Sequence, residues 1–160
     1  MLNIKIVCVG KIKEKYLIDG IKEYEKRMKT MCKIEVIEVL EYKICENPSE
    51  SQILQCIDEE GNNILKKIGD REYIIPMCIE GVHLSSEDLA KKFEGITLNG
   101  ISKITFIIGG SHGISEKIKN KADLKLSMSK MTFPHMLARL MLIEQIYRAL
   151  NINSNTKYHK

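Results

Sequence analysis

The sequence of 160 residues has no apolar run close to the roughly 20 residues that a membrane-spanning helix needs. Its apolar start, Ile4–Val9, is only as long as a strand, contains Lys5, and is not followed by a signal-peptide cleavage pattern. The sequence therefore gives no reason to expect a membrane protein or an exported one. We expect the protein to stay in the cytoplasm.

Metal-binding and disulfide patterns are also missing. The five cysteines are an odd number, and no two of them form a Cys-x-x-Cys pair. The four histidines lack the close spacing that marks a metal cage. We therefore expect no metal site and no disulfide framework, but reduced and mostly buried thiols at Cys8, Cys32, Cys45, Cys56 and Cys78.

The patterns of common hydrolases and nucleotide-binding proteins are absent as well. There is no Ser-His-Asp arrangement and no Gly-x-Ser-x-Gly elbow. The glycine-rich stretch at 109–113 lacks the Lys-Ser/Thr ending of a nucleoside-triphosphate loop and the glycine spacing of a dinucleotide fingerprint. By itself this stretch indicates only a tight turn after a strand.

What is present indicates one globular α/β domain spanning residues 1–160. Hydrophobic residues make up 44% and charged residues 29%, which is typical of a packed soluble core. Strands alternate with helices, and this predicts a mainly parallel sheet with helices on both faces. Pro76 cannot donate to a ladder, so it must lie at an edge, a bulge or a strand end. Strands are expected at 4–9, 33–39, 73–79 and 104–108 and at Leu126-Ser127, and helices at 16–28, 50–68, 86–99, 115–121 and from a Thr132 cap onward.

The last helix is apolar around nearly its whole circumference. Such a helix is either buried in the core of its own chain or covered by a second copy, and in a chain this small we favour a dimer interface. Glu144 and Arg148, one turn apart, are expected to pair on its remaining polar strip.

Two loops follow strands and predict a small-molecule pocket. They are the glycine-rich stretch and the segment Met128–Phe133, which contains hydroxyl residues and no acid. Paired loops without a phosphate-binding lysine suit a ligand that is aromatic and cationic, such as S-adenosylmethionine. Residues 101–160 contain 10 Lys or Arg and 3 Asp or Glu, which suggests a large anionic second substrate such as RNA. A solvated basic face without a partner explains the charge about as well.

The chain ends as Tyr158-His159-Lys160 after a polar segment, Asn151–Lys157. Terminal residues usually fray, so a disordered tail is one interpretation. The other is a tail that docks onto an active site and supplies a base, a phenol and a cation.

These motifs together resemble the ribosomal RNA large subunit methyltransferase H family of SPOUT methyltransferases. The resemblance covers essentially the whole chain, and it rests on Gly109-Gly110-x-x-Gly113, Leu126-Ser127-x-Ser129-x-Met131-Thr132-x-Pro134-His135, Glu144-Gln145-x-Tyr147-Arg148-Ala149 and Tyr158-His159-Lys160. It implies an α/β fold with a C-terminal trefoil knot and a homodimer. It also implies methylation of N3 of a pseudouridine in helix 69 of 23S ribosomal RNA, in the assembled 70S ribosome, with S-adenosylmethionine as the methyl donor.

The resemblance also assigns roles to residues. It implies cofactor contacts at Met77, Gly109, Met128, Ser129, Lys130, Met131, Thr132 and Phe133. It implies catalytic roles for Tyr158, His159 and Lys160, with Arg139 and Lys160 holding RNA. We further expect one subunit to bind the cofactor while the other contributes RNA-binding surface.

One segment departs from the family pattern. Many members have Arg-Gly-Glu before the terminal triplet, where this chain has Ser154-Asn155-Thr156 followed by Lys157. This change could alter how the tail turns or holds phosphate. Two other functions therefore stay open: a ribosome-binding protein that has lost turnover, and a Rossmann-like nucleotide-binding protein.

Overall fold

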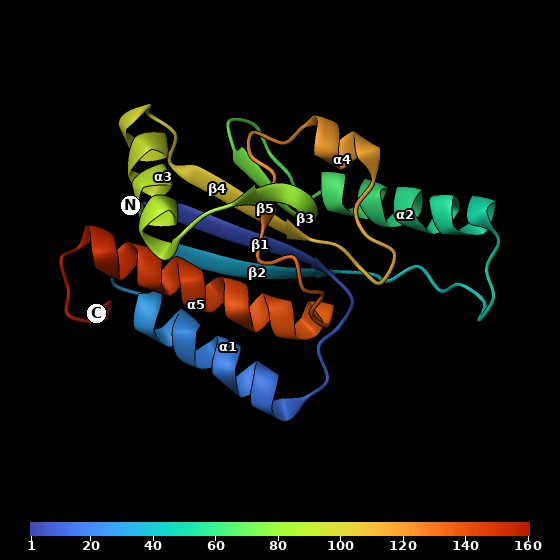
Figure 1. Cartoon of the computed structure of the whole chain (residues 1–160), viewed down its shortest axis with the longest axis horizontal. Coiled ribbons are helices and arrows are strands. Elements are labelled where there is room, and N and C mark those ends of the chain that lie inside the picture. Colours follow the sequence, from blue (N-terminus) through green and yellow to red (C-terminus); the bar gives the residue numbers. More distant parts are fainter.

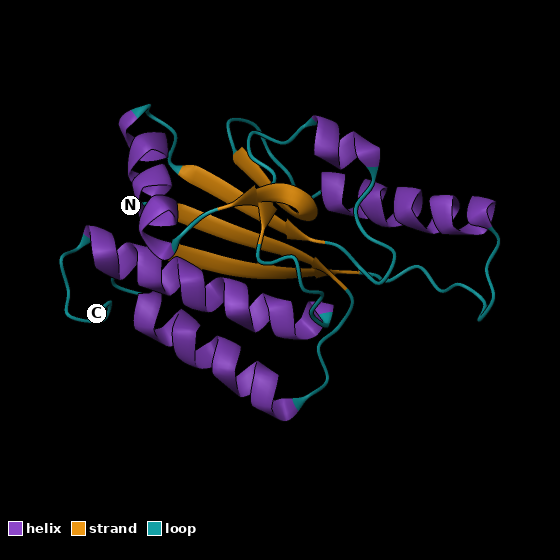
Figure 2. Cartoon of the chain, in the orientation of Figure 1, coloured by secondary structure: helices purple, strands orange, loops and turns teal.

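A five-stranded sheet lies at the centre of the structure, a computed structural model that describes residues 1–160 (Figures 1 and 2). Its strand order is β2-β1-β4-β3-β5, and every pairing is parallel. The parallel sheet predicted from the alternation of elements is confirmed. The strands are β1 (Asn3–Val9), β2 (Lys33–Val39), β3 (Tyr73–His83), β4 (Lys103–Ile108) and β5 (Leu126–Ser127).

Helices cover both faces of this sheet, as predicted. Along β1, Ile4, Ile6 and Cys8 pack in a cluster with residues of α1, α3 and α5, whereas Val7 and Val9 pack on the other face with residues of α2 and α4. Side chains of a strand alternate between faces, so β1 is buried on both sides. The helices are α1 (Lys15–Met28), α2 (Glu50–Leu65), α3 (Ser86–Leu98), α4 (Glu116–Asn120) and α5 (His135–Asn153).

Two predicted helix starts are confirmed in atomic detail, and one is wrong. Ser49 and Gln52 form a capping box at α2, and the Ser85 side chain accepts a hydrogen bond at the start of α3. However, α5 begins at His135 and not after a Thr132 cap. The cause is Pro134, which disfavours helical backbone at the residue before it and so keeps Phe133 out of the first turn.

Strand β3 bends around the short strand β5. Pro76 is the last β3 residue paired with β4, at the irregularity that we expected a proline to mark. Beyond it, Met77 and Val82 both pair with Leu126. A Cβ atom added at Gly81 would lie 2.7 Å from the backbone carbons of Lys125 and Leu126. The two segments therefore cross so closely that only glycine fits.

Helix α5 is largely covered within its own chain by α1, α3 and the sheet (Figure 1). Leu142, Ile143 and Ile146 are at most 1% exposed, and Asn153 is the only residue of the helix in the exposed class. Burial in the core of the chain therefore accounts for most of its apolar character. No helix has the length and apolar character needed to cross a membrane.

Candidate active site

A cleft of about 550 Å³ opens at the carboxyl ends of β3, β4 and β5. Its size falls within the usual range for small-molecule sites. Seven of the eight residues predicted to contact a cofactor line it: Met77, Gly109, Met128, Ser129, Met131, Thr132 and Phe133. Lys130, the eighth, is exposed between two lining residues. The structure therefore brings the two predicted loops together around one cavity.

The glycine loop after β4 is a tight turn that leaves its backbone open to the cleft. Gly113 has a φ of 95°, a region that favours glycine, and Gly110 and Gly113 form an isolated bridge. A Cβ atom added at Gly109 would lie 2.7 Å from the Gly113 carbonyl oxygen. Larger residues at these positions would change the path of the loop and fill the space beside the backbone.

The second loop is shaped by its own hydroxyl groups. Ser127 donates a hydrogen bond to the Ser129 carbonyl at 3.1 Å, and Ser129 Oγ accepts one from the Met131 N–H at 3.1 Å. The Met131 side chain is 74% exposed at the rim of the cleft. This places an apolar side chain where it can cover a bound ligand.

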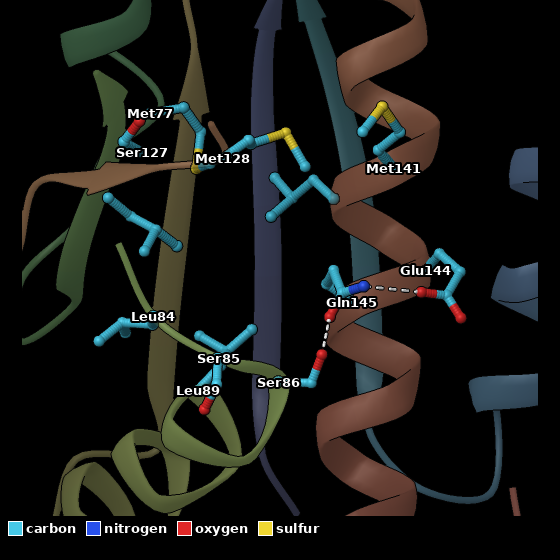
Figure 3. Close-up of a pocket in the computed structure, with 12 residues that line it drawn as sticks. Met77, Leu84, Ser85, Ser86, Leu89, Ser127, Met128, Met141, Glu144 and Gln145 are labelled. Carbon is cyan, nitrogen blue, oxygen red and sulfur yellow. Dashed lines mark hydrogen bonds between the residues drawn. The ribbon is translucent and has the colours of Figure 1, made fainter. Parts of the chain in front are cut away.

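A second cavity of about 420 Å³ adjoins the cleft and shares four lining residues with it: Met77, Leu126, Ser127 and Met128. It extends between the start of α3 and the middle of α5 (Figure 3). Its far end is polar: Ser86 Oγ donates to Gln145 Oε1 at 2.6 Å, and Gln145 Nε2 donates to Glu144 Oε2 at 3.1 Å. We call it the adjoining pocket.

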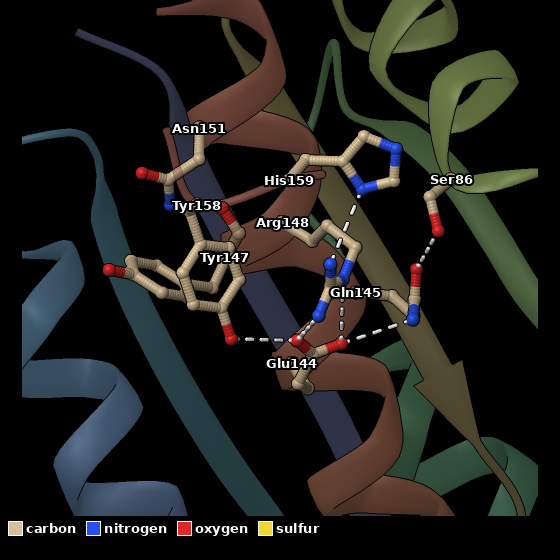
Figure 4. Close-up of polar contacts among 8 residues, drawn as sticks. All are labelled: Ser86, Glu144, Gln145, Tyr147, Arg148, Asn151, Tyr158 and His159. Carbon is tan, nitrogen blue, oxygen red and sulfur yellow. Dashed lines mark hydrogen bonds and ion pairs between the residues drawn. The ribbon is translucent and has the colours of Figure 1, made fainter. Parts of the chain in front are cut away.

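The C-terminal tail docks beside this polar end and does not fray (Figure 4). The Tyr158 hydroxyl donates to Glu144 Oε1 at 2.9 Å, and Glu144 also accepts from Arg148 at 2.8 Å. His159 Nε2 lies 2.8 Å from Glu87 Oε1, and its Nδ1 lies 3.3 Å from Arg148 Nη1. The expected Glu144–Arg148 pair is confirmed. Its two side chains contact Tyr158 and His159 and so hold the tail on α5.

The sequence profile of the family described as "Predicted SPOUT methyltransferase" matches residues 2–159. The chain belongs to the SPOUT methyltransferase family. It is 52% identical to a ribosomal RNA large subunit methyltransferase H of Leuconostoc mesenteroides and 50% identical to one of Streptococcus thermophilus. Each match covers 99% of this chain and all of the relative. A solved structure of a probable methylase family protein from Haemophilus influenzae has a similar fold, with a TM-score of 0.54 and 15% identity over 98% of this chain and 70% of that one.

The electrostatics of this SPOUT methyltransferase distinguish the two aromatic groups of its tail. Burial and the Glu144 carboxylate both raise the pKa of Tyr158 far above its usual value, so the phenol stays protonated as a donor. The hydrogen bond from His159 lowers the pKa of Glu87, which therefore remains a carboxylate. Arg148 can only donate, so His159 Nδ1 accepts and its proton lies on Nε2 toward Glu87.

Arg139 is buried and has its partners within the chain. It is 1% exposed, and its guanidinium donates to Glu38 Oε2 at 2.6 Å and to the Gly10 carbonyl at 3.1 Å. These contacts tie α5 to the end of β1 and to β2. The contact of Arg139 with RNA phosphate stays a prediction. Lys160, the other predicted RNA contact, is exposed.

The departure from the family pattern in the tail is accommodated by its backbone. Asn155 has a φ of 55°, at the position of the glycine in Arg-Gly-Glu. Asparagine tolerates this left-handed region better than other residues with a Cβ atom. Thr156 then donates to the Asn151 side-chain oxygen at 2.6 Å. Asn155 and Thr156 thus shape the turn that returns the tail to α5.

Sequence reasoning missed the roles of Ser86 and Glu87 in the site. The hydroxyl of Ser86 and the carboxylate of Glu87 meet α5 and the tail across 59 and 72 residues of sequence. In the sequence, these two residues indicated only the start of a helix.

Four cysteines are buried as expected, and burial raises the pKa of the Cys8 thiol to about 12. No group of three or more His, Cys, Asp or Glu side chains is placed so that it could hold a metal ion.

Proposed function

We propose that this SPOUT methyltransferase transfers a methyl group from S-adenosylmethionine to N3 of a pseudouridine in helix 69 of 23S ribosomal RNA. We place the reaction on the assembled 70S ribosome, in the cytoplasm. The observation that carries the proposal is the cleft of two strand-end loops, which the adjoining pocket connects to the docked Tyr158-His159 tail. The names of the full-length relatives and the basic residues of the last third of the chain also support it.

The residues of the cleft fit this cofactor. The glycine loop offers backbone at Gly109, while Met77, Met128 and Phe133 offer apolar contacts for an adenine ring. Ser129 and Thr132 add hydroxyl groups, and the exposed Lys130 contributes through its backbone at the rim. When bound, S-adenosylmethionine would supply the methyl carbon, carried on a sulfonium whose sulfur leaves as a neutral thioether.

The target N3 carries a proton that must leave during transfer, and His159 is our proposed acceptor. Its Nδ1 lone pair is occupied by Arg148 in the docked tail, so binding of RNA must first separate these two groups. His159 lines neither cavity in the docked tail, so we propose that RNA binding also carries the tail toward the shared wall, where the freed Nδ1 accepts the N3 proton. Tyr158 acts as a hydrogen-bond donor, because its raised pKa rules out a phenolate base near neutral pH.

We assign the charged substrate contacts to exposed lysines. Lys160 is exposed next to His159, and it is proposed to hold RNA phosphate or the developing anion of the base. We also propose that the protein works as a homodimer, in which the second subunit adds RNA-binding surface. The close crossing of β3 and β5 supports the further proposal that the C-terminal segment threads a loop to form a trefoil knot.

Transfer of labelled methyl groups tests the reaction. Purified protein and labelled S-adenosylmethionine are incubated with 70S ribosomes lacking the modification, with free 23S RNA and separated subunits in parallel. We expect label in the 70S sample and little in the others. Calorimetry on the same preparation measures cofactor binding. Binding without transfer to any RNA sample would overturn the proposal and favour a ribosome-binding protein without turnover.

A further inference from the structure

The adjoining pocket is drawn in Figure 3. It shares with the cofactor cleft the wall formed by Met77, Leu126, Ser127 and Met128. We propose that this pocket receives the target base, and that Gln145 selects pseudouridine over uridine by pairing with its N1–H and O2. This inference rests on the proposed function, because it takes pseudouridine N3 as the methyl acceptor.

The pocket has the size and lining that a flipped pyrimidine requires. Its volume of about 420 Å³ accommodates a base and part of a ribose. Leu84, Leu89, Met128 and Met141 line its sides, and methionine sulfur packs favourably against aromatic rings. Because Met77 and Met128 belong to both cavities, a base in this pocket has one edge directed to the cofactor cleft. N3 must lie on that edge.

The Gln145 side chain is held in one orientation at the polar end of the pocket. A carboxylate can only accept, so the NH₂ group of Gln145 must be the one facing Glu144 at 3.1 Å. Ser86 Oγ donates to the amide oxygen at 2.6 Å. Glu144 is itself fixed by Arg148 and Tyr158. One lone pair and one N–H of the amide therefore remain for a ligand.

This free donor and acceptor match one edge of pseudouridine and leave its reactive nitrogen open. In pseudouridine the sugar is attached through C5, so N1–H is a donor beside the O2 acceptor. The Gln145 oxygen accepts from N1–H and its amide donates to O2, while N3 on the neighbouring edge faces the cofactor. Uridine in the same place presents C5–H beside O4. It keeps one hydrogen bond and leaves the Gln145 oxygen facing a carbon.

The expected discrimination follows from the loss of one buried hydrogen bond. A site built to accept a hydrogen bond from its substrate disfavours an analogue that lacks the donor. For one bond in a partly open pocket, we expect roughly 10-fold to 100-fold higher kcat/KM for ribosomes with pseudouridine than for ribosomes with uridine at the target position. Gln145 makes the hydrogen bonds that distinguish the two bases, and Ser86 is a positioning residue that orients the Gln145 amide.

The test compares methyl transfer to 70S ribosomes that carry pseudouridine or uridine at the target position. Three proteins are measured: wild type, Gln145→Met and the control Gln55→Met, which makes the same change at an exposed site on α2. Methionine keeps the length of glutamine but removes both hydrogen-bonding groups. We expect Gln145→Met to lose the preference mainly through a slower reaction with pseudouridine. Its cofactor affinity, and the preference of Gln55→Met, should equal those of wild type.

Other outcomes separate the inference from the proposed function. If wild type methylates pseudouridine and Gln145→Met keeps the full preference, the assignment of Gln145 is wrong. An equal loss on both substrates would show a merely structural role and would also overturn it. If light scattering shows that Gln145→Met alone becomes monomeric, a second copy fills the pocket and the base does not. Absence of transfer by wild type to either ribosome would defeat the proposed function itself.

Ser86→Ala is the second variant, because it removes the hydroxyl that orients the amide and leaves the apolar side chains of the pocket in place. We expect it to lower the pseudouridine preference part of the way, with unchanged cofactor binding and unchanged thermal unfolding. An undiminished preference in this variant would contradict the positioning role of Ser86.

Discussion

The histidine at the end of the chain has two defined partners, and these partners decide how it can act. In the docked tail, His159 accepts from Arg148 and donates to Glu87, so it is neutral and has no free lone pair. Removal of the ring deletes the proposed proton acceptor and leaves the cofactor cleft intact. We therefore expect His159→Ala to lower kcat for methyl transfer by roughly 100-fold or more.

Single-turnover transfer to 70S ribosomes measures this effect, and calorimetry with S-adenosylmethionine is the control for an intact cleft. His83→Ala, a histidine at the end of β3 outside both cavities, is the matched variant and should react like wild type. Wild-type rates for His159→Ala would show that another group removes the N3 proton.

Glu60 is a buried carboxylate that should make the stability of the protein depend on pH. This carboxylate is 3% exposed, one oxygen accepts from the Tyr42 N–H at 3.0 Å, and the other has no partner. Burial raises its pKa above the usual 4.5, so the folded state binds a proton more tightly than the unfolded state. Its contribution to the free energy of unfolding therefore falls as the pH rises above about 4.5.

We expect Glu60→Gln to remove this dependence. Urea unfolding between pH 4 and pH 8 measures the free energy of unfolding of both proteins. The value for the variant, relative to wild type, should rise with pH by at most about 1.4 kcal/mol per pH unit. Glu59→Gln, at an exposed neighbouring position, is the control. Its free energy of unfolding should differ from that of wild type by the same amount at every pH. A constant difference for Glu60→Gln would mean that folding does not change the pKa of Glu60.

At the scale of elements, the short-range signals in the sequence predicted the structure correctly, except for the Thr132 cap before α5. The serine caps, the β1 and β4 strands and the Glu144–Arg148 pair all depend on residues within four positions of each other or on strand-length apolar runs. The path of β3 around Leu126 and the docking of the tail depend on contacts between distant segments. No periodicity encodes those contacts.

The buried position of Arg139 shows the same limit. In the sequence analysis, the family resemblance implied that it contacts RNA phosphate. Its partners, Glu38 and Gly10, lie 101 and 129 residues away in the chain. Only the packing of α5 against the ends of β1 and β2 shows that its charge is used inside the protein.

The crossing of β3 and β5 leaves no room for a side chain at Gly81. An added Cβ would lie 2.7 Å from the backbone of Lys125 and Leu126, which cannot move like a flexible side chain. We expect Gly81→Ala to lower the free energy of unfolding by roughly 1–3 kcal/mol and to weaken cofactor binding through Met77 and Met128.

The control is Gly95→Ala in α3, where an added Cβ meets nothing within 4 Å. Alanine is the better helix former, so this variant should be more stable than wild type by about 0.5–1 kcal/mol. Urea unfolding and calorimetry compare the three proteins. If Gly81→Ala is as stable as wild type, the crossing is looser than the structure indicates.

At the scale of the whole molecule, the proposed homodimer joins one subunit's cofactor cleft to the other subunit's RNA-binding surface. Mixing two inactive variants tests this division. One lacks Tyr158-His159-Lys160, and the other carries Gly109→Val, which fills the space that the glycine loop leaves beside the cleft. We expect mixed dimers to recover up to about half of the activity of a wild-type dimer, because one of the two composite sites has both parts intact. No recovery, with mixed dimers shown to form, would place both functions in one subunit.

The position of the methyl group on the ribosome tests the central claim most directly. A methyl on N3 blocks the pairing edge of a base, so reverse transcription of treated ribosomal RNA stops next to it. After incubation of unmodified 70S ribosomes with the protein and S-adenosylmethionine, we expect one new stop, at the target pseudouridine of helix 69 in 23S RNA. A stop elsewhere, or labelled ribosomal protein with no stop, would contradict the account.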